Sequence, residues 1–197
     1  MIIGTASRLA GLPLTVAGMA DALVIPGLMY GPAAPLPMYT GDLAERRGAA
    51  VHRHVWSAEP PDYDEPGIEK WVCDQVTPVL DRLGGTPLLI GKSLGANAAR
   101  LAAQRSLPAV WLTPALRFMP WVVEALTAAD APFLLVGGTA DRSWDADLAH
   151  RLTPHVLSVD GADHGMYVPG PLRGSIEVLG LVVDSVETFL DDIGWPT

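Results

Sequence analysis

Residues 91–95, Gly-Lys-Ser-Leu-Gly, place a serine between two glycines at the spacing Gly-x-Ser-x-Gly. This pattern is typical of a sharp strand-to-helix turn that holds a serine in a sparsely populated backbone conformation and exposes its hydroxyl as a nucleophile. Both outer positions are glycine because larger side chains would collide in so tight a turn. The apolar run 86–90 favours a strand, and the alanine-rich run 94–104 favours a helix. The sequence therefore predicts that Ser93 is the nucleophile of an acyl-transfer reaction.

The same stretch also contains Gly-Lys-Ser, the end of a phosphate-binding loop, which requires a further glycine five places before the Gly-Lys pair. That position is Thr86, and Gly85 comes one place too early. Residues 87–90 are an apolar run that favours a buried strand rather than a glycine-rich loop. A nucleotide-binding protein is therefore disfavoured. An ordinary helix N-cap at Ser93 is a second alternative, but a cap does not require both flanking glycines.

A serine nucleophile needs a base that takes its proton, a group that orients the base, and donors for the oxyanion. Asp141 follows the predicted strand 132–138, and His164 follows the predicted strand 155–161. The carboxyl ends of parallel strands lie at one edge of a sheet, so both residues are expected beside Ser93. The order along the chain is then Ser, Asp, His.

Simpler interpretations of the same residues stay open. Asp141 could be a turn residue that precedes a helix, with Asp145 and Asp163 as the nearest alternatives for the carboxylate. His164 could be a histidine of a surface loop. A match at one of the three positions would make the other two more convincing.

Strands and helices alternate along the chain, which argues for a mostly parallel central sheet with helices on both faces. The predicted strands are 21–27, 49–57, 86–90, 109–115, 132–138 and 155–161, and the predicted helices lie within 41–48, 68–85, 94–104, 120–131, 144–153 and 175–193. Residues 1–7 and 12–19 could pair as a hairpin, and residues 28–41, rich in Pro, Gly, Met and Tyr, are expected to form a loop. We expect a single domain, 1–197.

With its elements in this order, the sequence resembles the α/β-hydrolase superfamily, and most of all its small lid-less bacterial serine hydrolases of the carboxylesterase and dienelactone-hydrolase-like kind. The resemblance covers nearly the whole chain and is carried by LVIPGLMYG (23–31), IGKSLGANAA (90–99), PFLLVGGTADRSWD (132–145) and VDGADHGM (159–166). It implies an α/β-hydrolase fold without a lid domain and a serine esterase with no cofactor and no metal. A strict dienelactone hydrolase would carry cysteine at position 93, so Ser93 argues against that subgroup.

The resemblance also implies a role for each site residue. Ser93 would be the nucleophile, His164 the general base and then the acid, and Asp141 the orienting carboxylate. The oxyanion would be held by the backbone N–H groups of Leu94 and Leu28. Members of the superfamily often carry His-Gly-x in the loop of this second donor, where the present chain has Pro-Gly-Leu.

Predicted helices and strands occupy nearly all of the interval between Ser93 and Asp141, so no room remains for a lid domain. We therefore expect a shallow, solvent-open cleft that favours short or bulky acyl groups over long chains and shows no activation at an oil–water interface. Its expected borders are Met29, which is also an alternative oxyanion donor, Tyr30, Met38, Phe118, Met119 and Trp144.

Composition restricts the partners. Hydrophobic residues make up 49% of the 197 residues and charged residues 18%, as in a globular chain. A net charge of −9 disfavours nucleic acid and anionic membrane surfaces, and no apolar run is long enough to span a membrane. The expected partner is a small-molecule acyl substrate. The single cysteine favours the reducing cytoplasm, although residues 7–22 loosely resemble an export signal.

The remaining histidines and the cysteine have no evident catalytic or metal-ligating partner in the sequence. His52 and His54 alternate on a predicted strand and face one side, but no third metal ligand is near, so both are expected to be structural. His150, in a short helix, and His155, at the start of a strand, have no catalytic neighbour in the sequence. Cys73 occupies an apolar-periodic helix and is expected in the core.

Two classes of function remain compatible with the sequence. The first is a serine hydrolase that cleaves ester, thioester or related acyl bonds through an acyl-enzyme. The second is a non-catalytic binding or scaffold domain of the same fold. The presence of all three triad residues favours the enzyme.

Overall fold

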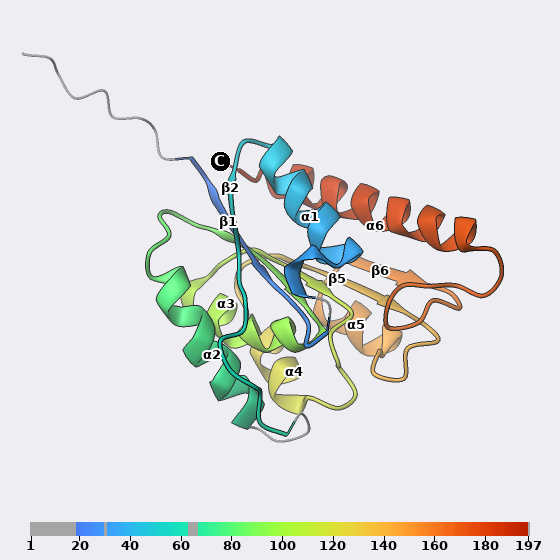
Figure 1. Ribbon diagram of the computed structural model, residues 1–197, viewed down its shortest axis with the longest axis horizontal. Coiled ribbons are helices and arrows are strands. Elements are labelled where there is room, and N and C mark those ends of the chain that lie inside the picture. Colours follow the sequence, from blue (N-terminus) through green and yellow to red (C-terminus); the bar gives the residue numbers. More distant parts are fainter. Residues whose placement is uncertain (1–18, 30, 63–66, 197) are drawn as a thin grey trace, which may run out of the picture.

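The computed structural model describes residues 19–29, 31–62 and 67–196 (Figure 1). The possible hairpin and the export-like stretch rest mainly on residues 1–18, which lie outside the described residues. The strands are β1 (Asp21–Ile25), β2 (Ala50–Arg53), β3 (Leu88–Lys92), β4 (Ala109–Leu112), β5 (Phe133–Gly138) and β6 (Val156–Val159). The helices are η1 (Gly31–Ala33), α1 (Pro35–Arg46), α2 (Gly67–Leu80), η2 (Ser93–Ala98), α3 (Ala99–Arg105), α4 (Pro120–Thr127), α5 (Ala146–Leu152) and α6 (Leu172–Asp192).

The strands form one parallel sheet in the order β2-β1-β3-β4-β5-β6, which confirms the predicted parallel α/β architecture. The strand order reverses between β1 and β3, because the chain runs outward to β2 on one side and through β4 to β6 on the other. In open parallel sheets, ligands bind beyond the carboxyl ends of the strands at such a reversal. The loop after β1 and the turn after β3 meet at this point.

Helices cover both faces of the sheet. Helices α1 and α6 lie side by side on one face, whereas α2, α3, α4 and α5 cover the other (Figure 1). Alternate residues of each strand supply the two cores: in β1, Ala22 and Val24 pack toward α1 and α6, and Leu23 and Ile25 pack toward α2. Successive side chains of a strand point to opposite faces, so a strand buried on both faces is a continuous apolar run.

The start of the first helix differs from the prediction. Helix α1 begins at Pro35, inside the stretch 28–41 that was expected to be a loop. Proline is well tolerated at the first helical position because its φ is already helical and its missing N–H needs no partner there. Pro37 also lies within the first turn, where backbone N–H groups have no intrahelical acceptor. The two prolines therefore start the helix rather than prevent it.

The predicted helix 94–104 is helical but begins as a 3-10 helix, η2, before α3 continues it. The fully buried Asn97 donates from Nδ2 to the Leu94 carbonyl at 2.9 Å and accepts from Trp121 Nε1 at 2.7 Å. A side chain that binds a nearby carbonyl competes with the regular helical ladder. Asn97 thereby holds the tight turn that follows Ser93.

Among the described residues, no helix is sufficiently long and apolar to cross a membrane.

Candidate active site

The turn from β3 into η2 holds Ser93 at a φ of 50°, in the left-handed region that non-glycine residues rarely adopt. The neighbouring strands leave no room for a side chain at either glycine of the turn. A Cβ at Gly91 would lie 2.5 Å from the ring of Trp111, and a Cβ at Gly95 would lie 2.2 Å from the carbonyl oxygen of Ile25 in β1. The turn is thus pressed against the neighbouring strands β4 and β1, which gives a more specific reason for the glycines than collision within the turn.

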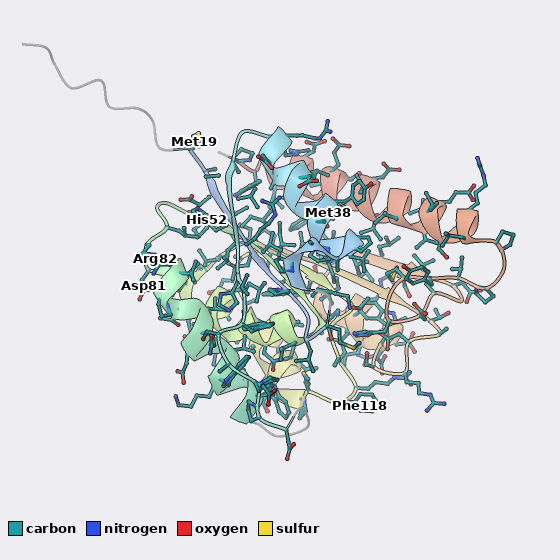
Figure 2. All side chains as sticks on the ribbon, in the orientation of Figure 1. Met19, Met38, His52, Asp81, Arg82 and Phe118 are labelled. Atoms are coloured by element: carbon teal, nitrogen blue, oxygen red, sulfur yellow. The ribbon has the colours of Figure 1, made fainter. Side chains whose placement is uncertain are left out.

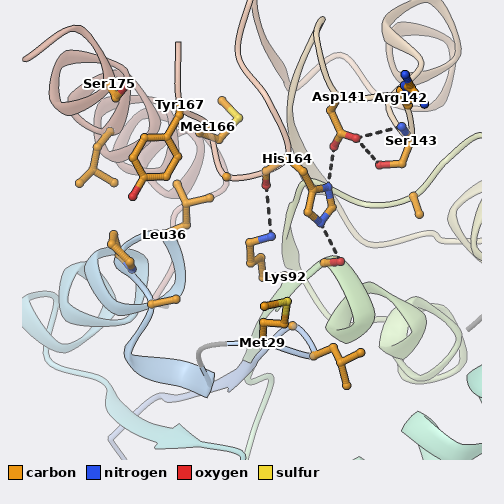
Figure 3. A pocket seen from close by; sticks show the side chains of 18 of the residues that line it. Met29, Leu36, Lys92, Asp141, Arg142, Ser143, His164, Met166, Tyr167 and Ser175 are labelled. Carbon is orange, nitrogen blue, oxygen red and sulfur yellow. Dashed lines mark hydrogen bonds and ion pairs between the residues drawn. The ribbon is translucent and has the colours of Figure 1, made fainter. Parts of the chain in front are cut away.

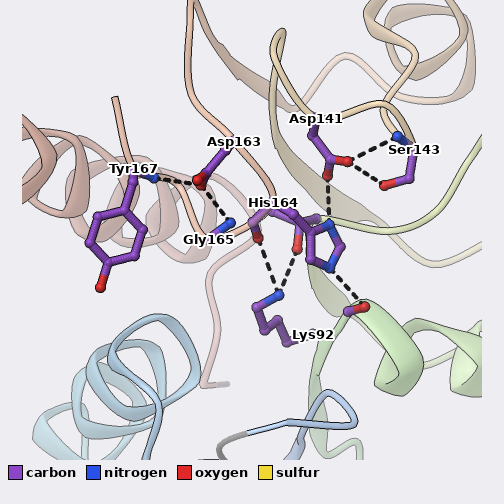
Figure 4. A network of polar contacts seen from close by, with 9 residues as sticks. Lys92, Asp141, Ser143, Asp163, His164, Gly165 and Tyr167 are labelled. Carbon is purple, nitrogen blue, oxygen red and sulfur yellow. Dashed lines mark hydrogen bonds and ion pairs between the residues drawn. The ribbon is translucent and has the colours of Figure 1, made fainter. Parts of the chain in front are cut away.

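Three side chains from separate loops meet at this turn (Figure 4). His164 Nε2 lies 2.9 Å from Ser93 Oγ, and His164 Nδ1 lies 2.7 Å from Asp141 Oδ2. Both are hydrogen-bond distances, so the three side chains form one continuous series. They follow β3, β5 and β6, whose carboxyl ends share one edge of the sheet.

The carboxylate of Asp141 is well buried, and both of its oxygens accept hydrogen bonds. Its Oδ1 accepts the backbone N–H of Ser143 at 2.9 Å and the Ser143 hydroxyl at 2.7 Å, while Oδ2 faces His164. Burial would raise the pKa of Asp141, but hydrogen bonds from His164 and Ser143 outweigh it and hold that pKa below its ordinary value. An ionised Asp141 favours the tautomer of His164 with its proton on Nδ1, which leaves Nε2 free to accept.

The two alternative carboxylates are engaged in local turns. Asp145 caps α5 by accepting the N–H of Leu148 at 2.9 Å. Asp163 Oδ1 accepts the N–H groups of Gly165 and Tyr167 at 2.8 and 2.9 Å (Figure 4). Both fix the shape of loops near the site.

Lys92 precedes the serine and ties two of the loops together. Its Nζ donates to Thr113 Oγ1 at 3.1 Å and to the carbonyl oxygen of His164 at 3.3 Å (Figure 4). Burial lowers the pKa of Lys92 to about 8, although Asp141 and Asp163 nearby favour the charged form. Partial removal from water therefore destabilises the charged ammonium of Lys92 beside the backbone carbonyl of His164.

This lowered pKa predicts a pH dependence of stability. Between about pH 8 and pH 10.5, the unfolded chain keeps the Lys92 proton and the folded chain has lost it, so the free energy of unfolding rises with pH. Relative to Lys92→Met, the unchanged protein should gain up to about 3 kcal/mol between pH 7 and pH 10.5. Urea unfolding of both proteins at the two pH values measures this difference. An equal difference at both pH values would contradict the lowered pKa.

The loop after β1 carries the expected second oxyanion donor. Leu28 lines the same cavity as Ser93, and the carbonyl of Gly27 accepts a hydrogen bond from Trp56 Nε1 at 3.2 Å. In a trans peptide the C=O and the following N–H point in opposite directions, so Trp56 fixes the direction of the Leu28 N–H. Sequence reasoning missed this contact, because no local pattern links residue 56 to residue 27. The other expected donor residue, Leu94, has a fully buried side chain.

Ser93 opens into a cavity of about 1140 Å³ (Figure 3), here called the Ser93 cavity. Of the border residues predicted from the sequence, Met29 and Phe118 line it. Met38 lies on α1 outside the lining (Figure 2), and Tyr30 is outside the described residues.

The structure places two other predicted border residues in the core. Met119 is 1% exposed and contacts Asn97 through Sδ, and Trp144 is 3% exposed. The Trp144 ring lies where a Cβ at Gly137 would come within 2.2 Å, and its Nε1 donates to Ser158 Oγ. Both side chains turn inward because the apolar space beneath the strand ends is available to them, so they support the sheet rather than border the Ser93 cavity.

The Ser93 cavity has walls that were not predicted from the sequence. One wall is the first part of α6, with Leu172, Ile176 and Leu179, and another is the start of α1, with Leu36. The missing lid was inferred from the interval between Ser93 and Asp141, but these walls come from elements outside that interval.

The other histidines and the cysteine lie away from Ser93. His52, at the β2 edge of the sheet (Figure 2), bonds Asp21 Oδ1 at 2.8 Å, and His54 packs edge-on against Trp56. His150 lies in α5, and His155 packs against Phe189. Burial raises the pKa of the Cys73 thiol to about 12, as for an unreactive side chain. No group of three potential metal-ligating side chains occurs in the part of the chain that the structure describes.

Comparisons with known proteins identify the architecture. Est1E from Butyrivibrio proteoclasticus is similar with a TM-score of 0.65 and 14% identity, over 88% of each chain. Mouse alpha/beta hydrolase domain-containing protein 10 has a TM-score of 0.60 and 14% identity, over 88% of this chain and 90% of that chain. XC6422 from Xanthomonas campestris, an α/β serine hydrolase without lid, has a TM-score of 0.52 and 17% identity, over 90% of this chain and 86% of that chain.

No protein-family model matches the sequence, and no curated protein matches it significantly. The likeness to solved structures therefore concerns the fold. One of these structures is Est1E with ferulic acid bound. With its parallel sheet, its strained serine turn after β3 and these likenesses over most of its length, the chain has the α/β-hydrolase fold, and no lid is inserted among the residues that the structure describes.

Proposed function

We propose that the protein is a serine hydrolase that cleaves ester, thioester or related acyl bonds of small molecules through an acyl-enzyme. The observation that carries this proposal is the hydrogen-bonded series from Ser93 Oγ through His164 to Asp141, at a serine held with φ 50°. A structural serine or a helix cap would need neither the strain nor the two partners in line.

The first half of the reaction acylates Ser93. As Ser93 Oγ attacks the acyl carbonyl carbon, His164 Nε2 takes the hydroxyl proton and the carbonyl oxygen becomes an oxyanion. Backbone N–H groups of Leu94 and Leu28 donate to that oxyanion. The imidazolium then protonates the leaving alcohol or thiol, the bond between carbonyl carbon and leaving group breaks, and an ester of Ser93 remains.

The second half reverses these roles with water as the nucleophile. His164 takes a proton from the water, whose oxygen attacks the acyl-enzyme carbonyl carbon. The collapse of the second tetrahedral intermediate returns the proton to Ser93 Oγ and releases the carboxylic acid. Throughout, the carboxylate of Asp141 orients His164 and stabilises its charged form, while Ser143 holds the carboxylate itself.

Two features support a small acyl substrate. The cavity that contains Ser93 is lined mainly by apolar side chains, as ligand cavities commonly are. Est1E, which shares the fold, binds ferulic acid, a small molecule with an acyl group. Esters of aromatic and aliphatic acids are therefore the first compounds to assay.

The proposal is tested with a fluorophosphonate probe, which reacts with activated serines and forms a stable adduct. We expect one adduct per chain, located at Ser93 by mass spectrometry of peptides, and loss of labelling after heat denaturation. A folded protein that stays unlabelled and hydrolyses no p-nitrophenyl ester would instead be a non-catalytic binding domain.

The contact of Trp56 with the oxyanion loop leads to a further prediction. The ring centroids of Trp56 and Trp71 lie 5.0 Å apart, and Trp56→Phe largely keeps this aromatic packing. The hydrogen bond to the Gly27 carbonyl is lost in this variant. The Leu28 N–H is then less firmly directed, so we expect kcat to fall about tenfold with little change in KM.

The control for this variant is Trp71→Phe, which alters the same aromatic group without removing the Trp56 donor. Steady-state kinetics of both variants on one p-nitrophenyl ester provide the comparison. If both lose activity equally, the effect comes from packing, and Trp56 does not direct the loop.

A further inference from the structure

Helix α6 presents two apolar faces. One is buried against the sheet through side chains that include Val178, Val182, Val186 and Phe189. A second set, Leu172, Ile176 and Leu179, is spaced four and three residues apart and lines the Ser93 cavity. We call this set the α6 strip. Its spacing places the three side chains on one side of the first two helical turns. Leu179 is partly buried against the same core, but packing against the sheet does not account for the other two, because Leu172 is 64% and Ile176 is 60% exposed.

Exposed apolar side chains gather at this cavity. Ten large hydrophobic side chains of the described residues are exposed, and six of them line the Ser93 cavity: Leu28, Met29, Phe118, Tyr167, Leu172 and Ile176. Single exposed hydrophobic residues are common on protein surfaces, but a group around one cavity marks a binding surface. The same cavity contains Ser93, so the natural occupant of this surface is part of the substrate.

A second wall of the cavity is also apolar. Two cations, Lys92 and Arg142, line the cavity, and Arg142 lies beside Asp141 and Ser143, on the other side of His164 from this wall (Figure 3). Ala33 at the end of η1, Ala34 before α1 and Leu36 in its first turn line the cavity, and Figure 3 shows Leu36 and Tyr167 on the far side of Lys92 from His164. The Lys92 ammonium is bound to Thr113 and to the His164 carbonyl. An acetyl group on Ser93 would leave most of this wall in contact with water.

We propose that the α6 strip and the start of α1 form a groove for a medium-length aliphatic chain of the substrate, attached to the carbonyl that Ser93 attacks. The inference rests on the proposed hydrolase function and adds the substrate class. From residue 172 to residue 179 the helix rises about 10 Å, the length of about eight methylene groups. A chain of this length can therefore be buried along the strip, whereas a much longer one would emerge into solvent.

The first experiment measures kcat/KM for p-nitrophenyl esters from acetate to dodecanoate, below the concentrations at which they form micelles and relative to their alkaline hydrolysis rates. A methylene group fully withdrawn from water contributes about fourfold. We expect kcat/KM to rise at least about tenfold from acetate to octanoate and to level off beyond about ten carbons. A flat or falling series would overturn the proposal.

A pair of variants on the same helix tests the location of the groove. Ile176→Gln replaces an exposed side chain of the α6 strip, and Leu181→Gln replaces a 50% exposed side chain of α6 that does not line the cavity. The ratio of octanoate to acetate kcat/KM should fall about fivefold in Ile176→Gln and stay unchanged in Leu181→Gln. Equal effects of the two variants would place the chain elsewhere and refute the groove.

The side of the ester that occupies the groove is tested separately. A second series keeps the acetyl group and lengthens the alcohol from ethyl to octyl acetate. A rise in this series alone would contradict the assignment to the acyl side, and a rise in the p-nitrophenyl series alone supports it. Failure of the hydrolase proposal looks different: the folded protein would then hydrolyse none of the esters and would not react with the fluorophosphonate probe.

Discussion

Replacing Ser93 by alanine should lower kcat/KM for p-nitrophenyl esters by at least about 10⁴-fold, because no other group can form the acyl-enzyme. The hydroxyl oxygen lies 2.9 Å from His164 Nε2, and only this atom is removed. The residual rate would come from binding and the oxyanion donors acting on water. Stopped-flow and steady-state assays measure the loss, and fluorophosphonate labelling should disappear with it.

A matched control exists elsewhere on the same chain. Ser106 also has a positive φ, 51°, but it is the exposed C-terminal cap of α3. Ser106→Ala makes the same chemical change in a similar backbone conformation, so turnover should be unaffected. Ser93→Ala must also unfold at about the same temperature as the unchanged protein. Full esterase activity in folded Ser93→Ala would rule out the proposed nucleophile.

Gly95→Ala should cause a large loss of stability. A methyl group at this position would lie 2.2 Å from the Ile25 carbonyl oxygen and 2.9 Å from its carbonyl carbon, and both are backbone atoms of a central strand. Neither can rotate away, so β1 and the serine turn must separate. We expect a loss of about 2–4 kcal/mol in the free energy of unfolding. Activity should fall as well, because the shift moves Ser93 relative to His164.

The control for this substitution is Gly180→Ala. Gly180 lies in the interior of α6 with no atom near the position of an added Cβ. The same change should therefore raise the free energy of unfolding by about 0.5–1 kcal/mol, through the helix propensity of alanine. Urea unfolding of both variants measures the two opposite effects. A stable, fully active Gly95→Ala would contradict the contact between the serine turn and β1.

Most of the fold could be predicted because both faces of the sheet are covered. Each central strand then contains a short apolar run, as in residues 88–90 and 133–136, and such runs are visible in the sequence. The start of α1 was less accessible, since Pro35 and Pro37 resemble loop residues until their position in the first turn is known. The contact of Asn97, in the 3-10 helix η2, with Trp121 was not accessible either, because the two residues are far apart in the sequence.

The candidate site was likewise only partly predictable from the sequence. Ser93, Asp141 and His164 each follow a strand, so the sheet itself brings them to one edge, and their proximity could be expected from sequence. The surroundings could not. Met119 and Trp144 turn into the core rather than toward the cavity, a choice made by the space beneath them. The contact of Trp56 with Gly27 and the position of the α6 strip depend on how distant elements pack.

Helix α6 carries side chains proposed to bind the substrate, and these lie on different elements from the residues proposed to cleave it. The residues proposed for bond cleavage follow β3, β5 and β6, whereas Leu172 and Ile176 stand on the outer side of a helix whose core contacts lie on another face. Substitutions at these two exposed positions leave the sheet and the serine turn untouched and cost little stability. After gene duplication, such positions can drift while the reaction persists, so substrate preference should diverge among descendants of this chain well before chemistry does.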